Sequence, residues 1–218
     1  MATHRRGHVL TYCGLMVARQ ESHPATGAVG PAEFRAAAEK MRAAAVRPEV
    51  FCEEMPAPQR IAPWSTALSA DVTVDEVDLG TGRIILLHDP AGNDAWEGTF
   101  RCVAYARAEI ETDMITDPLL PGVGWAWLVE ALDAHGADHT AASGTVTRVA
   151  TDSFGGMSDE GGTAQIEIRA SWTPQDPAAL GDHVEAWGEL LCTAAGLPPV
   201  PDGVTAIPSR RGQRGPGR

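Results

Sequence analysis

Hydrophobic residues follow two periods along the middle of the chain. A period of two predicts half-buried β-strands, and a period near 3.6 predicts amphipathic helices. Strands are expected over residues 50–54, 68–74, 83–88, 100–110, 145–150 and 164–172. Helices are expected to begin at Pro31, at Asp117-Pro118 and at Asp176-Pro177, and the last two to end at Gly136 and Gly196. The helical stripes expected to face the core are Phe34, Ala38, Met41 and Ala45; Val123, Trp127, Ala131 and Ala134; and Leu180, Val184, Trp187, Leu191 and Ala194.

This order of elements predicts an α+β fold in which one antiparallel sheet carries its helices on one face. After the N-terminal helix come two strand–strand–helix units, and Trp127 to Trp187 and Gly136 to Gly196 are both 60 residues apart. We therefore expect two pseudo-repeated units. The alternative is chance similarity, because Asp-Pro helix starts and C-terminal glycines are common.

A single domain is expected over residues 31–197, between two ends of different composition. Residues 1–30 contain an apolar run, Val9–Ala18, that resembles a signal peptide but is followed by Arg19 without a small-residue cleavage site. We interpret residues 1–30 as a disordered extension or as the result of a wrong start, with Met16 as the other candidate start. Residues 198–218 are rich in Pro, Gly and Arg, which is typical of a disordered tail.

The chain is strongly acidic, and this charge limits its partners. It has 17 basic and 29 acidic residues in 218, a net charge of −12, and four of the arginines lie in the last ten residues. The remaining body repels polyphosphate, so nucleic acid is an expected partner only through the C-terminal tail. No apolar stretch approaches the roughly 20 residues that span a bilayer, and we expect no membrane association.

The cysteines and glycines match no cofactor or metal motif. Cys13, Cys52, Cys102 and Cys192 are too far apart in sequence for a zinc knuckle or a redox pair. We interpret them as free thiols in a reducing cytoplasm. The glycine-rich run 153–157 lacks dinucleotide-binding spacing, and no cofactor is expected.

Two segments resemble a known family. They are residues 47–63, with the sequence RPEVFCEEMPAPQRIAP, and residues 88–98, with the sequence HDPAGNDAWEG. Both are similar to an actinobacterial family catalogued as domain of unknown function 3000, and the similarity extends over about residues 31–211. The resemblance implies a bacterial cytoplasmic protein and assigns no activity or catalytic residue.

One loop could carry chemistry. His88, Asp89, Asp94 and Glu97 could bind a divalent cation or act as an acid and a base, provided that they converge. The same residue types also form ordinary turns, and we favour the turn because the spacing matches no calcium loop.

Two further groups could form a surface for a partner. Glu53, Glu54 and Arg60 lie in or before a proline-rich stretch with Trp64, and Trp96 follows in a later loop; the alternative is an edge strand that leaves through a rigid linker. Alternation also places Arg101, Tyr105, Arg107 and Arg169 on the face of the sheet away from the core. That face could bind a ligand, a partner or a second copy of the chain, or could carry only solvated ion pairs.

The sequence favours a non-enzymatic binding or adaptor domain, because it shows no nucleophile–base set and no metal-ligand spacing. The partner would be an unknown protein or another copy of the chain. The second hypothesis is a hydrolase or metal-dependent enzyme built on His88–Glu97. The third is an RNA-associated factor that uses the arginine-rich tail.

Overall fold

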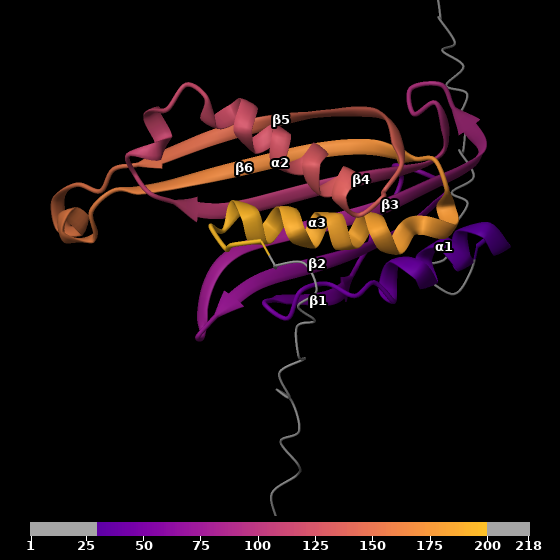
Figure 1. Cartoon of the computed structure of the whole chain (residues 1–218), viewed down its shortest axis with the longest axis horizontal. Coiled ribbons are helices and arrows are strands. Elements are labelled where there is room, and N and C mark those ends of the chain that lie inside the picture. The colour runs from indigo at the N-terminus through magenta and orange to yellow at the C-terminus, as the bar shows by residue number, and fades with distance from the viewer. Residues whose placement is uncertain (1–29, 200–218) are drawn as a thin grey trace, which may run out of the picture.

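A six-stranded antiparallel sheet in the order β1-β2-β3-β4-β6-β5 forms the frame of the molecule. The computed structural model describes residues 30–199, and three α-helices lie on one side of the sheet (Figure 1). The strands are β1 (Val50–Met55), β2 (Trp64–Val74), β3 (Val77–Asn93), β4 (Gly98–Ile110), β5 (His139–Thr151) and β6 (Thr163–Pro174). The helices are α1 (Ala32–Arg42), α2 (Leu120–Ala134) and α3 (Leu180–Ala194), with short 3₁₀ turns η1 (Met114–Thr116), η2 (Gly155–Glu160) and η3 (Pro177–Ala179). The predicted α+β class is confirmed.

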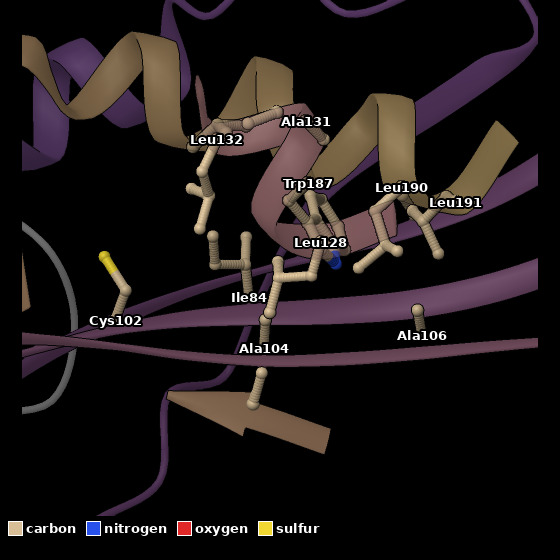
Figure 2. Packing of buried hydrophobic residues seen from close by; sticks show 14 of the residues in the cluster. Ile84, Cys102, Ala104, Ala106, Leu128, Ala131, Leu132, Trp187, Leu190 and Leu191 are labelled. Atoms are coloured by element: carbon tan, nitrogen blue, oxygen red, sulfur yellow. The ribbon is translucent and has the colours of Figure 1, made fainter. Parts of the chain in front are cut away.

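Small residues on the central strands let the helices approach the sheet closely. On β4 the side chains of Cys102, Ala104 and Ala106 are buried toward the helices. Trp187 and Leu128 reach this layer from α3 and α2 (Figure 2). The alternation of β4 therefore produces one face that is covered by helices and one that is not.

Helix α3 matches its predicted stripe. The side chains predicted to face the core are all buried: Leu180, Val184, Trp187, Leu191 and Ala194. The helix begins at Leu180 and not at the predicted Asp176-Pro177, because these residues start the 3₁₀ turn η3, in which the Asp176 carboxylate accepts a hydrogen bond of 2.8 Å from the Ala178 N–H. At its end, Gly196 adopts a φ of 76°, a left-handed conformation that favours glycine.

Helix α2 buries a different face from the predicted one. Val123 is 42 % exposed and Trp127 is only half-buried, so the expected stripe through these residues is wrong. The buried residues are Leu120, Gly124, Leu128, Ala131 and Leu132. The cause is the sequence of α2, which is apolar on nearly every side, so that periodicity alone does not select a face. The proposed pseudo-repeat is not confirmed, because Trp127 and Trp187 occupy unlike environments.

Two predicted boundaries also change. Helix α1 ends at Arg42, and Ala45, expected on its buried stripe, is exposed and donates its N–H to the Glu185 carboxylate at 2.9 Å. The predicted loop after His88 is largely strand, because β3 and β4 continue to pair at Asn93 and Gly98 beyond an irregularity. Pairing with a neighbouring strand overrides the low strand propensity of proline and glycine there.

The ends of the chain contribute no described structure. The expected N-terminal extension and C-terminal tail lie almost wholly in residues 1–29 and 200–218, outside the described residues. Within residues 30–199, no helix is both long and apolar enough to cross a membrane.

Candidate functional site

The sheet face opposite the helices, called the open face below, carries a row of aligned polar side chains. Antiparallel pairing places Arg83 of β3 opposite Tyr105 of β4, and Tyr105 opposite Arg169 of β6. Because strands alternate, these three side chains point away from the helices. From the other side, the Trp187 indole N–H donates to the Tyr105 carbonyl at 3.2 Å, which fixes the backbone beneath the row.

Tyr105 lies between two cations. The Cζ atoms of Arg83 and Arg169 are 5.6 and 5.0 Å from the centre of its ring, within the range of a cation–π interaction. The Tyr105 hydroxyl donates to a Glu167 carboxylate oxygen at 3.2 Å, and Arg169 donates to the other oxygen at 2.8 Å. Desolvation, followed by the nearby Glu167 charge, raises the pKa of Tyr105. The hydrogen bond from Arg169 lowers the pKa of Glu167.

Arg101 is held at the other end of the open face by neutral groups. Its side chain is 6 % exposed, and its guanidinium donates to Thr173 Oγ1 at 3.1 Å and to Ser171 Oγ at 2.7 Å. It also reaches Ser143 Oγ at 3.3 Å and the Ser171 carbonyl at 3.2 Å. Burial lowers the pKa of Arg101. The Thr173 hydroxyl donates in turn to the Trp96 carbonyl, which ties the β3–β4 turn to this end of the face.

Most of the open-face arginines lack an acidic partner. Within residues 30–199, no carboxylate lies within 4.0 Å of the guanidinium nitrogens of Arg83, Arg101 or Arg107. Arg107 donates instead to the neutral Gln165 side chain at 2.9 Å. Their positive charges are therefore not neutralised by direct ion pairs, although Glu97 attracts Arg101 and Glu167 attracts Arg107 over longer distances.

The open face carries both signs of charge, whereas the rest of the domain is strongly acidic. Residues 30–199 contain 10 basic and 27 acidic side chains, a formal charge of −17. Four of the 10 basic side chains lie on the open face of three adjacent strands, and these are Arg83, Arg101, Arg107 and Arg169. The gathering of four of the ten basic side chains on one face is the main electrostatic feature of this surface, although Asp71, Glu109 and Glu167 lie on the same face.

The structure separates the partner-surface candidates taken from the sequence. Arg101, Tyr105, Arg107 and Arg169 lie together on the open face, and Glu53 lies at its β1 edge. The other four candidates lie elsewhere. Glu54 faces the helices, 2.8 Å from Arg42; Trp64 packs near Phe34, with ring centres 6.5 Å apart; Arg60 lies between β1 and β2; and Trp96 lies in the β3–β4 turn.

Arg83 was missing from the predicted surface. Residues 83–88 look apolar on both sides, which predicts a central strand but hides the outward orientation of its first residue. The alternation of Ile84, Leu86 and His88 toward the helices was the available signal, because it places Arg83 on the opposite face. That Arg83 lies opposite Tyr105 follows only from the register of the β3–β4 hairpin.

His88 and the three carboxylates of its predicted loop do not come together. His88 is fully buried on the helix side, with ring centres 4.1 Å from Phe100 and 5.9 Å from Phe34. Its Nδ1 donates to the Thr99 carbonyl at 3.0 Å. Its Nε2 lies 3.1 Å from Glu33 Oε1, at ion-pair distance but without the geometry of a hydrogen bond. His88 is thus part of the packing between α1 and the sheet.

The carboxylates of that loop remain on the surface. Asp94 and Glu97 line a shallow hollow of about 430 Å³ over the β3–β4 turn, and neither His88 nor Asp89 lines it. Asp89 accepts a hydrogen bond of 3.0 Å from the Ala91 N–H, which is ordinary turn chemistry. Within residues 30–199, no three His, Cys, Asp or Glu side chains are placed to hold a metal ion.

A second hollow lies between α1 and β1. It measures about 120 Å³ and is bordered by Met41, Cys52 and Val184. Ligand pockets usually have roughly 300–1,000 Å³, so this hollow is small for a cofactor or metabolite. Burial raises the pKa of the Cys52 thiol to about 11 and the pKa values of the Cys102 and Cys192 thiols to about 12. These three thiols are therefore poor nucleophiles at neutral pH.

Comparison with known protein families assigns the chain to one of them. A family model described as a protein of unknown function (DUF3000) matches residues 30–205. The chain belongs to the DUF3000 family. No curated protein and no solved structure matches it. The DUF3000 match contains every element from α1 to α3, so the open face lies wholly within the family domain.

Proposed function

We propose that this DUF3000 domain is a non-enzymatic binding module whose open face binds an acidic segment of a partner protein. The observation that supports the proposal is the cluster of four arginines in a domain of charge −17. Three of them, Arg83, Arg101 and Arg107, have no carboxylate within 4.0 Å among the described residues. Opposite charge attracts a partner and selects against wrong ones.

The mixture of charges favours a protein over a nucleic acid. Glu167 lies among the arginines, and Asp71 and Glu109 border them on β2 and β4. Acidic side chains at such positions oppose a continuous line of phosphates, as does the charge of the whole domain. Tyrosine and arginine are also the residue types that most often contribute large binding energies at protein interfaces.

Arg101 provides the most preorganised contact point. The hydroxyls of Ser143 and Ser171 accept hydrogen bonds from Arg101 and lie 3.4 Å apart, so one of their O–H groups can donate to the other hydroxyl and the second to an external acceptor. A carboxylate placed there would receive this hydrogen bond and would neutralise a buried charge that is otherwise only partly compensated. We therefore expect a Glu or Asp side chain of the partner at this end of the open face.

The proposal is tested by the binding of a fluorescent oligoglutamate peptide to the full chain, measured by anisotropy. Wild type should bind at low salt and more weakly as sodium chloride is added, because salt screens exposed charges. The double variant Arg83→Glu/Arg169→Glu should lose most of this binding. The matched control, Arg35→Glu/Lys40→Glu on α1, makes the same charge change on the helix side and should retain binding.

Three results would contradict the proposal. They are no binding by wild type at low salt, equal loss in both double variants, and binding that survives the open-face substitutions. A single-stranded RNA tested alongside distinguishes the two kinds of partner. If RNA binds more tightly than the peptide and depends on Arg83 and Arg169, the acidic-protein assignment is wrong.

A further inference from the structure

β5 forms one edge of the sheet, and its outer side faces no other strand within residues 30–199. Its one strand neighbour is β6, and 13 residues, His139–Thr151, belong to it. The pairing with β6 is regular from Ser143 to Thr151, after an irregularity near Thr140. An edge of this length presents a row of N–H and C=O groups that can pair with another strand.

β5 lacks most of the protection that usually prevents such pairing. Proteins guard their edges with charged residues, proline, short strands or bulges. The opposite edge, β1, is guarded in this way: it has six residues, includes Glu53 and Glu54, and is followed by Pro56. β5 contains no Asp, Glu, Lys or Pro. Its one arginine, Arg148, is engaged by the carbonyls of Ile115 and Asp117 at 3.0 and 2.9 Å.

Exposed apolar side chains gather near one end of β5. Eight large apolar side chains of the described residues are exposed, and four of them lie in the two segments that adjoin the C-terminal end of β5. Met114 and Leu119 flank the carbonyls that bind Arg148, and Phe154 and Met157 follow β5 in the turn to β6. A partner strand would add contacts with apolar area next to its backbone hydrogen bonds.

We propose that a second copy of this chain pairs its β5 antiparallel with this β5 across a two-fold axis. Charge selects this surface for self-association. Each domain carries −17 over residues 30–199, so two copies repel each other over most orientations. The strip His139–Thr151 has no acidic side chain, and the two copies can meet there without placing carboxylates of β5 opposite one another.

The regular part of β5 sets the register of the pair. Its middle residue is Thr147, so a two-fold axis there places Thr147 opposite its own image and Arg148 opposite Val146 of the second copy. The sheets of both copies then join into one. A two-fold axis perpendicular to a sheet keeps equivalent faces on the same side, so the two open faces become neighbours on one surface. The inference rests on the β5 edge and does not depend on the acidic partner proposed above.

Disulfide cross-linking of the full chain tests the pairing directly. Residues opposite each other in antiparallel strands have Cα atoms about 4.5–5.5 Å apart, a separation that a disulfide can bridge. Thr147→Cys faces its own image, so oxidation should convert it largely to a covalent dimer. Thr145 lies opposite Val149 of the second copy, so Thr145→Cys and Val149→Cys should cross-link when mixed and not when each is alone. Thr81→Cys, an exposed threonine on the same face of the central strand β3, is the matched control and should not cross-link.

Light scattering of the native chain and of charge variants gives an independent test. Wild type should have twice the mass of one chain, Thr147→Glu and Thr147→Arg should each halve it, and mixing the two should restore it. Thr81→Glu should leave the mass unchanged, and circular dichroism should show that every variant is folded. A wild type that stays monomeric at all accessible concentrations overturns the proposal. A dimer that neither cross-links through β5 nor responds to Thr147→Glu also overturns it.

Discussion

The imidazole of His183 is buried with one nitrogen satisfied and the other not. The Trp172 indole N–H donates to its Nδ1 at 3.1 Å, and an indole can only donate. The neutral ring must therefore carry its proton on Nε2, which is buried without a partner within the described residues. Burial is the main reason that the pKa of His183 falls to about 4.

His183 should make stability fall as the pH falls. Its pKa is about 4 in the folded state against an ordinary value of 6.5, so the unfolded chain binds a proton first. Its contribution is fully present above about pH 6.5 and is lost progressively toward pH 4, by up to about 3 kcal/mol. Urea unfolding of wild type and His183→Asn between these pH values measures it. The variant keeps an acceptor for Trp172, and its free energy of unfolding should change less with pH than that of wild type. An equal change with pH in both proteins would show that His183 is not the group responsible.

Two tryptophans on neighbouring helices should respond very differently to truncation. Trp187 is fully buried and bonded to the Tyr105 carbonyl, whereas Trp127 is only half-buried. Trp187→Ala should lower the free energy of unfolding by about 3–5 kcal/mol, the usual range for large buried aromatic residues. Trp127→Ala should cost clearly less. Denaturant midpoints check both, and equal losses would show that burial does not determine the difference.

At the scale of elements, α3 lies so close to β3 that one strand position has no room for a side chain. A Cβ atom on Gly82 would lie 2.7 Å from Leu191, 2.8 Å from the Tyr105 carbonyl oxygen and 2.9 Å from Trp187. The last two of these residues also support the open face from beneath. The contact between helix and strand thus links the core to the proposed binding surface.

Gly82→Ala should therefore destabilise the domain. Real Cβ contacts are almost never this short, and the clash includes a backbone atom that cannot move alone. Overpacking of this kind costs about 1–3 kcal/mol. Gly122→Ala in α2 is the matched control, because its Cβ would meet nothing within 4 Å and alanine favours a helix. A thermal melt should show a lower Tm for Gly82→Ala alone; an unchanged Tm would mean that α3 can move away at little cost.

For the whole molecule, charge is the dominant surface property. A formal charge of −17 over residues 30–199 opposes compaction through self-repulsion. The four open-face arginines reduce that repulsion locally but lie on one side of the sheet. The proposed binding of an acidic partner and the stability of the domain at low salt therefore depend on the same four arginines.

Sodium chloride should raise the Tm of the domain by screening this repulsion. Chloride is the suitable anion, because sulfate also stabilises proteins through exclusion from their surface. Arg83→Glu/Arg169→Glu makes the domain more negative, so its Tm should rise more steeply with sodium chloride than that of wild type. A charge-neutral pair of substitutions at exposed threonines should leave the salt dependence of Tm unchanged. A Tm that is independent of sodium chloride in both proteins would contradict a major role for self-repulsion.

The sequence by itself determined the class of fold and most of its elements. Alternation in β4 and β6 and the stripe of α3 identified the two sides of the sheet, because a period of two or of 3.6 directly reports which side is buried. The same alternation placed Arg101, Tyr105, Arg107 and Arg169 on the outer face. Local turn chemistry at Asp176 gave the 3₁₀ turn that leads into the last helix, and Gly196 gave the end of that helix.

Only the tertiary structure decided how those elements meet. The buried face of α2 depends on its neighbours, since its own sequence is apolar nearly all round. The row of Arg83, Tyr105 and Arg169 depends on the register of three strands, which is set by pairing between residues far apart in the chain. The burial of His88 and the exposed edge of β5 depend on the order of strands in the sheet. Hydrophobic periodicity records the side to which a residue points, and strand order and register record which residue it meets.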